Sequence, residues 1–196
     1  TSSVVQSNLR RLKTLVIFQM GKRSDFERKP RDFYPTPLVA VEPLIDHLPK
    51  HFTFAEPCAG NGALINHLET RGGHGLCMWA SDIEPQHKGI STQDYRDVKE
   101  NELLDSNYII TNPPWDRKVL HPMIEHFAPL KPTWLLFDAD WMHTKQSQPY
   151  MPFLHKIISV GRIKWFGNMT GKDNCAWYLF DKQTPPVFGT TFYGRT

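Results

Sequence analysis

The residues Asn112-Pro113-Pro114-Trp115 carry groups suited to holding a planar amine. Asn112 offers a side-chain carbonyl, and the two prolines stiffen the chain while their own carbonyls stay available as acceptors. The carbonyls of Asn112 and Pro113 can accept the two N–H bonds of an exocyclic amine, and Trp115 offers a face for the ring that carries it. The alternative is an ordinary proline turn with Trp115 as a core aromatic residue.

The residues before this turn predict the element that positions it. The apolar residues of a predicted strand over 107–111 end abruptly in an asparagine and two prolines, which indicates that the strand stops at the turn. In an open α/β sheet, ligands bind outside the carboxyl ends of the strands. The turn is therefore expected at the ligand-binding edge of such a sheet.

A second constellation lies upstream of the turn. A predicted strand over 52–56 runs into Pro57-Cys58-Ala59-Gly60-Asn61-Gly62, and a predicted helix begins at residue 63. Gly60 and Gly62 allow the backbone to approach a ligand closely, at a helix start whose N–H groups carry partial positive charge. Asp82 follows the next predicted strand, 76–80, where a carboxylate commonly holds ribose hydroxyls. Ile65 stands where a dinucleotide fingerprint needs its third glycine, which disfavours NAD.

The remaining elements complete an alternating α/β pattern. Thr36 is a suitable N-cap and Pro37 a suitable first residue for a helix over 37–48. A helix over 117–128 and a strand over 133–137 follow the central turn. The polar stretch 142–152 is expected to be a loop over the same crevice. Two further strands, 157–166 and 176–180, are expected to pair at the end of the chain.

In this order, the motifs over residues 32–181 resemble the gamma arrangement of the S-adenosylmethionine-dependent adenine-N6 DNA methyltransferases, in a compact form like those of phages and prophages. The resemblance rests on Asn112-Pro113-Pro114-Trp115 together with the loop 56–62 and Asp82. It implies an α/β fold: a Rossmann-like, seven-stranded class I methyltransferase sheet, mostly parallel with a C-terminal antiparallel pair. No separate target-recognition domain is expected, so loops near 116–121, 140–152 and 167–175 would read the bases.

The resemblance also assigns the site residues. Asn112, Pro113, Pro114 and Trp115 would be catalytic, and Trp115, Trp165 and Phe166 would stack on the target base, unless the last two are core aromatics. Asp94 would receive the amino group of the cofactor adenine, with Asp97 close enough to compete. The residues assigned to S-adenosyl-L-methionine are Phe33, Tyr34, Thr36, Glu56, Cys58, Gly60, Asn61, Gly62, Asp82, Ile83, Asp94 and Tyr95.

The distribution of charge along the chain indicates what kind of partner the protein binds. Residues 1–31 carry eight basic side chains against two acidic ones, a net of +6 in a chain of net +3, so the other 165 residues sum to −3. Such a basic arm fits contact with a phosphate backbone, although a solvated tail is as plausible. Residues 1–19, before Met20, are a candidate extension. Residues 32–196 suit one methyltransferase domain.

DNA is the expected partner, through the arm and the aromatic residues. RNA amino groups, protein glutamine, or a non-catalytic nucleic-acid-binding role are the alternatives. No metal is expected, because the nine histidines lack metal-ligand spacing. No apolar run approaches a membrane span, and three widely spaced cysteines suit a reducing, cytoplasmic setting.

Overall fold

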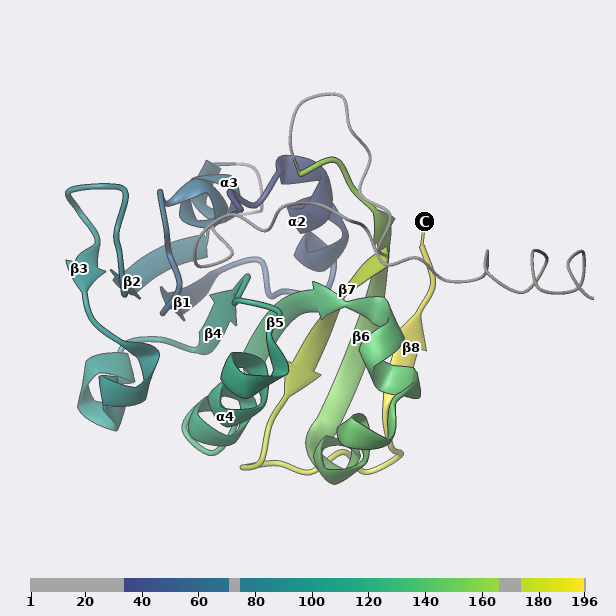
Figure 1. Cartoon of the computed structure of the whole chain (residues 1–196). Coiled ribbons are helices and arrows are strands. Elements are labelled where there is room, and N and C mark those ends of the chain that lie inside the picture. Colours follow the sequence, from purple (N-terminus) through teal and green to yellow (C-terminus); the bar gives the residue numbers. More distant parts are fainter. Residues whose placement is uncertain (1–33, 71–74, 166–173, 196) are drawn as a thin grey trace, which may run out of the picture.

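Eight strands form one sheet in the order β3-β2-β1-β4-β5-β7-β6-β8 (Figure 1). The computed structural model describes residues 34–70, 75–165 and 174–195. The strands are β1 (Phe52–Glu56), β2 (Gly75–Asp82), β3 (Ser91–Thr92), β4 (Tyr108–Thr111), β5 (Thr133–Asp138), β6 (Leu154–Arg162), β7 (Asn174–Phe180) and β8 (Thr191–Tyr193). The helices are α2 (Leu38–Ile45), α3 (Ala63–Thr70) and α4 (Arg117–Phe127), with 3-10 helices η2 (Tyr95–Asp97), η3 (Glu100–Leu103), η4 (Ala139–His143) and η5 (Lys145–Phe153).

The sheet is parallel except at β7. Strands β3, β2, β1, β4 and β5 run parallel to their neighbours, whereas β7 pairs antiparallel with both β5 and β6. The predicted mostly parallel sheet with a C-terminal antiparallel pair is confirmed. The predicted number of seven strands is wrong, because the short β8 adds an eighth strand parallel to β6.

Alternating side chains divide the core into two layers. Ile109, Leu135 and Phe137 face one layer with α4, while their neighbours Ile110 and Trp134 face the other with α2 and α3. This period of two is what a strand buried on both faces requires. Figure 1 shows α2 and α3 on one side of the sheet and α4 on the other. The helices thus hold the strand ends, and the loops on them, in fixed positions.

Two local predictions need correction. Helix α2 begins at Leu38, its N-cap is Pro37, and no side chain caps it, so Thr36 does not serve as the N-cap. The stretch 142–152 is not an open loop over the crevice but belongs to η4 and η5, which cross from β5 to β6. Its proline and polar content suggested a loop, yet short 3-10 turns tolerate both, and Tyr150 and Ser147 are buried within it.

His121 on α4 holds this crossover. The Trp141 indole N–H donates to Nε2 of His121 at 2.9 Å, so that nitrogen must be unprotonated. Burial, and then the Arg117 charge, lower the pKa of His121 from its ordinary value of 6.5. The neutral form is therefore favoured by folding, and its contribution to stability is present above about pH 6.5 and is lost as the pH falls through the folded-state pKa.

We expect the free energy of unfolding to fall between pH 7.5 and 5.5 by more in the wild-type protein than in His121→Gln. Glutamine can still accept from the Trp141 indole but does not titrate. Urea denaturation at the two pH values measures the difference. His155→Gln is the control, because the ring of His155 contacts the carbonyl of Asp181 and not this crossover. An equal loss of stability in wild type and His121→Gln would contradict the assignment.

Candidate active site

A cleft of about 760 Å³ opens at the carboxyl ends of β1, β2 and β4. It is lined by the segment before α2, the loop after β1, the end of β2, η2, the turn after β4 and the start of α4. The predicted residues that line it are Tyr34, Thr36, Glu56, Cys58, Gly60, Asn61, Asp82, Ile83, Asp94, Tyr95, Asn112 and Pro114. The fold therefore gathers most of the predicted cofactor residues and the catalytic asparagine around one cavity.

The loop after β1 is held against the end of β2. The Asp82 carboxylate accepts from the Gly60 backbone N–H at 2.8 Å and from the Glu84 N–H at 2.8 Å. Gly60 and Gly62 have positive φ angles of 53° and 78°, which favour glycine. Asn61 accepts from the Ala63 N–H at 3.1 Å and so caps the start of α3. Gly62 shapes the loop but does not itself line the cleft.

Glu56 is a buried acid at the base of the cleft. Its side chain is 2% exposed, and its Oε2 has no hydrogen-bond partner among the described residues. Burial, and then the charge of Asp82, raise the pKa of Glu56 well above its ordinary value. A buried carboxyl group without a partner is costly, so this oxygen is suited to receive a donor from a ligand.

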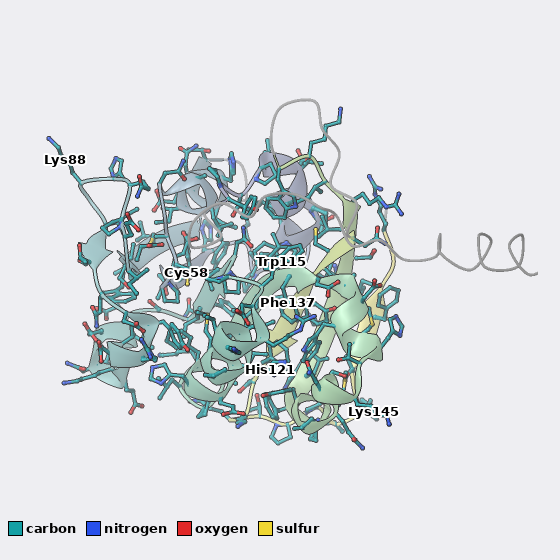
Figure 2. All side chains as sticks on the ribbon, viewed as in Figure 1. Cys58, Lys88, Trp115, His121, Phe137 and Lys145 are labelled. Atoms are coloured by element: carbon teal, nitrogen blue, oxygen red, sulfur yellow. The ribbon has the colours of Figure 1, made fainter. Side chains whose placement is uncertain are left out.

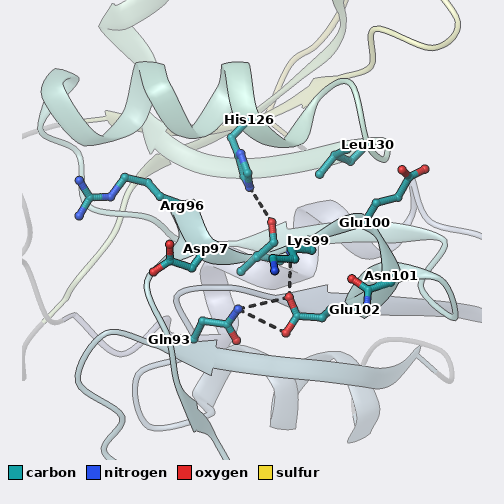
Figure 3. A pocket seen from close by; sticks show the side chains of 10 residues that line it. Gln93, Arg96, Asp97, Lys99, Glu100, Asn101, Glu102, His126 and Leu130 are labelled. Carbon is teal, nitrogen blue, oxygen red and sulfur yellow. Dashed lines mark hydrogen bonds between the residues drawn. The ribbon is translucent and has the colours of Figure 1, made fainter.

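Asp94 and Asp97, the two candidates for binding the amino group of the cofactor adenine, lie in different places. Asp94 lines the cleft, whereas Asp97 lines a separate hollow between η2, η3 and α4 (Figure 3). Asp94 also accepts from Arg96 at 2.6 Å, and the hydrogen bonds to Arg96 lower the pKa of Asp94. This ion pair was not predicted from the sequence. Ile83, which also lines the cleft, is 54% exposed and offers an apolar surface to a ligand.

The turn after β4 is fixed by hydrogen bonds from Asn112 and Trp115. Nδ2 of Asn112 donates to the Tyr34 carbonyl at 3.3 Å and to the Thr36 hydroxyl oxygen at 3.2 Å. The Trp115 indole N–H donates to the Leu136 carbonyl at 3.1 Å and lies 3.4 Å from Oδ1 of Asn112. The turn is thereby anchored both to the segment before α2 and to β5.

Three aromatic rings meet beside Asn112. Trp165 makes edge contacts with Trp115, at 5.7 Å between centroids, and with Tyr34, at 6.0 Å. Trp115 and Pro113 do not line the cleft themselves. Trp115, on the turn after β4, and Cys58, on the loop after β1, can be located in Figure 2. Phe33, Phe166 and the basic arm 1–31 lie outside the described residues. So does most of the loop 167–175.

The apolar wall of α4 was not among the predicted site residues. Val119 and Met123 line the cleft at a spacing of four residues, and Lys118 lies beside them. The helical stripe of apolar residues in 117–128 is the signal that could have identified them. Residues 117–121, expected to be part of a base-reading loop, form the first turn of α4. Asp138, at the end of β5, pairs with Arg117 at 2.8 Å and ties that turn to the sheet.

Comparison with known proteins identifies the fold. No family model and no curated protein sequence matches the chain. Among solved structures, it is similar to a Listeria monocytogenes protein provisionally described as a class I S-adenosylmethionine-dependent methyltransferase, with 13% identity, a TM-score of 0.50, and coverage of 80% of this chain and 62% of that one.

Two further structures give the same result. A dimethyladenosine transferase from Plasmodium falciparum is 15% identical with a TM-score of 0.50, over 77% of this chain and 63% of that one. The M protein of the type I restriction enzyme EcoKI is 13% identical with a TM-score of 0.52, over 83% of this chain and 48% of that one. The chain therefore has the class I methyltransferase fold, and it spans less than two thirds of the length of each of these structures.

No described helix is long and apolar enough to cross a membrane.

Proposed function

We propose that this protein transfers a methyl group from S-adenosyl-L-methionine to the exocyclic N6 amine of adenine in DNA. The observation that carries the proposal is the amide of Asn112, which stands in an Asn-Pro-Pro-Trp turn beside the cleft with its Nδ2 held by Tyr34 and Thr36. Its carbonyl oxygen is thus directed away from those two residues and toward Trp115. Residues 32–196 would act as one methyltransferase domain, and the arm 1–31 would contact the phosphate backbone.

The cleft residues fit S-adenosyl-L-methionine. The unpartnered Oε2 of Glu56 matches the ammonium group of the methionine part, and Asp82 at the end of β2 matches the ribose hydroxyls. The exposed Ile83 would cover one face of the cofactor adenine, and Asp94 would accept from its amino group. When bound, the cofactor supplies an activated sulfonium methyl group.

The protein's task is then to align the attacking amine. The lone pair of an adenine amine is delocalised into the ring, which makes it a poor nucleophile. Acceptors on Asn112 and Pro113 would each take one N–H bond of the amine and draw the nitrogen toward tetrahedral geometry as charge develops. In duplex DNA the base must leave the stack at a cost of a few kcal/mol, which stacking on Trp115, Trp165 or Phe166 would partly offset.

Charge at the sheet edge supports a nucleic acid as the acceptor. Since β4, β5, β6 and β8 run in the same direction, their carboxyl ends share one edge. Arg162, Lys164 and Arg195 are exposed at this edge beside Trp165, and no described residue forms an ion pair with any of them. Acidic residues (Glu56, Asp82, Glu84 and Asp94) line the cofactor cleft. The basic end therefore suits phosphates of a nucleic acid that enters from the side of Trp165.

We expect Arg162→Gln/Lys164→Gln to weaken duplex binding and to reduce its salt dependence. Each lost phosphate contact lowers the slope of log K against log salt by about 0.9, so two lost contacts lower it by about 2. Fluorescence anisotropy over a salt series measures the slope. The charge-matched control is Lys131→Gln/Lys182→Gln, because these lysines lie next to the amino end of β5 and the carboxyl end of β7, at the opposite edge of the sheet. Equal slopes in both double variants would contradict the proposal that Arg162 and Lys164 contact phosphates of the duplex.

Transfer of labelled methyl from S-adenosyl-L-methionine tests the function itself. Unmethylated duplex DNA, RNA and a protein extract serve as acceptors, and mass spectrometry identifies the modified nucleoside or residue. N6-methyladenine in DNA is the expected product. Label only in RNA or protein would replace the acceptor while retaining methyl transfer. Cofactor binding without any transfer would favour a nucleic-acid-binding role.

A further inference from the structure

The amide group of Asn112 is oriented by residues far away in the sequence. Its two described Nδ2 contacts, with the Tyr34 carbonyl and the Thr36 hydroxyl oxygen, span 78 and 76 residues. Thr36 is 5% exposed, and its side chain does not cap α2. Its hydroxyl group is therefore buried at the cleft without a role in the helix that it precedes.

The partners determine which way the amide faces. A backbone carbonyl such as that of Tyr34 can only accept, so the Asn112 atom that faces it must be the nitrogen. An indole N–H can only donate, so the atom near Nε1 of Trp115 must be the oxygen. Both ends of the amide thus require the same orientation. A rotated amide would bring two carbonyl oxygens together on one side and two N–H groups together on the other.

We propose that Thr36 is a positioning residue that keeps the Asn112 carbonyl turned toward the methyl acceptor. This inference rests on the proposed function, in which Asn112 accepts an N–H bond from the target amine. Among the described residues, the Tyr34 carbonyl, at 3.3 Å, is the one remaining partner that holds Nδ2 when the Thr36 hydroxyl is removed. The amide group is then less firmly held, and its carbonyl oxygen spends less time at the position where an acceptor is needed.

Three variants test the proposal. Thr36→Val keeps the shape but removes the hydroxyl, and we expect turnover at saturating cofactor and DNA to fall about tenfold, which corresponds to the loss of one neutral hydrogen bond. Thr36→Ser keeps the hydroxyl and should restore turnover to within about threefold of wild type. Thr133→Val is the matched control. It removes another buried threonine hydroxyl, which donates to the Lys131 carbonyl at the amino end of β5, and turnover should remain unchanged.

A kinetic comparison separates positioning from cofactor binding, since Thr36 also lines the cleft. The Kd for S-adenosyl-L-methionine, measured by calorimetry, should change by less than about threefold in Thr36→Val. A loss of cofactor affinity with turnover unchanged would make Thr36 a cofactor contact and overturn the proposal. Unchanged turnover and unchanged affinity in Thr36→Val would overturn it as well.

An NMR measurement reports on the side-chain amide of Asn112 and does not depend on methyl transfer. In protein labelled with ¹⁵N-asparagine, the side-chain signals of Asn112 are identified by their loss in Asn112→Ala. Their exchange with water should be about tenfold faster in Thr36→Val and unchanged in Thr36→Ser. Unchanged exchange in Thr36→Val would overturn the positioning role. If the wild-type protein methylates no acceptor, the proposed function fails, and this exchange rate alone decides whether Thr36 orients Asn112.

Discussion

Replacing Asn112 with alanine is expected to lower the rate of methyl transfer by at least about 100-fold, the size of effect seen when one preorganised polar group at a reacting centre is removed. The Asn112 carbonyl is one of the two proposed acceptors for the amine, and the amide nitrogen of the same side chain is held by Tyr34 and Thr36. The loss should appear in turnover, because this hydrogen bond strengthens as charge develops on the amine in the transition state. Single-turnover methylation of duplex DNA measures it.

Cofactor binding distinguishes this role from a structural one. Asn112→Ala should bind S-adenosyl-L-methionine with an affinity close to that of wild type, because Glu56, Asp82 and Asp94 remain in place. The matched control is Asn66→Ala. Asn66 lies on α3 and does not line the cleft. If Asn112→Ala lost cofactor affinity as strongly as turnover, Asn112 would be a structural residue and not part of the catalytic turn.

Replacing Glu56 with glutamine is expected to weaken binding of S-adenosyl-L-methionine by about 10-fold to 100-fold, as the loss of a charge-assisted hydrogen bond implies. The carboxyl group is 2% exposed, and its Oε2 lacks a partner within the described ranges. A glutamine side chain has nearly the same shape but cannot balance the charge of an ammonium group. Isothermal calorimetry compares the two affinities. Equal affinities would show that Glu56 does not receive the methionine ammonium group.

The same substitution should stabilise the protein in the absence of ligand. Burial and then Asp82 raise the pKa of Glu56 well above its ordinary value of 4.5, so the folded protein holds this proton more tightly than the unfolded chain does. The stability that protonated Glu56 contributes is complete below about pH 4.5 and is lost as the pH rises through the folded-state pKa. The gain in stability of Glu56→Gln over wild type should therefore grow with pH, as measured by denaturation at pH 5 and pH 8.

Glu69→Gln is a suitable control for that experiment. Glu69 is an exposed acid on α3 that accepts from the Cys77 backbone N–H at 3.0 Å. It is not one of the residues that line the cleft. We expect this variant to keep the cofactor affinity of wild type and to lack the gain in stability at high pH. A gain at high pH in Glu69→Gln as well would point to net charge, and not to burial of Glu56, as its cause.

Strong local patterns predicted most of the sheet. The runs at 52–56, 108–111 and 133–137 are apolar on both faces and end at turn residues, and each is a central strand. Strands β3 and β8 were not predicted because they are two and three residues long, too short to show a period of two. Trp165 was expected near the end of a strand, but β6 ends at Arg162.

By itself, the sequence determined which chemical groups stand at which strand end: the glycine loop after β1, Asp82 after β2 and the Asn-Pro-Pro-Trp turn after β4. These follow from local signals, since turn residues and apolar periodicity act over a few neighbouring positions. Only the tertiary structure decided that Asp94 lines the cleft while Asp97 lies in another hollow. It also decided that Thr36 binds Asn112 in place of capping a helix. The orientation of a side chain depends on partners that folding brings together from 76 residues away, and no local pattern carries that information.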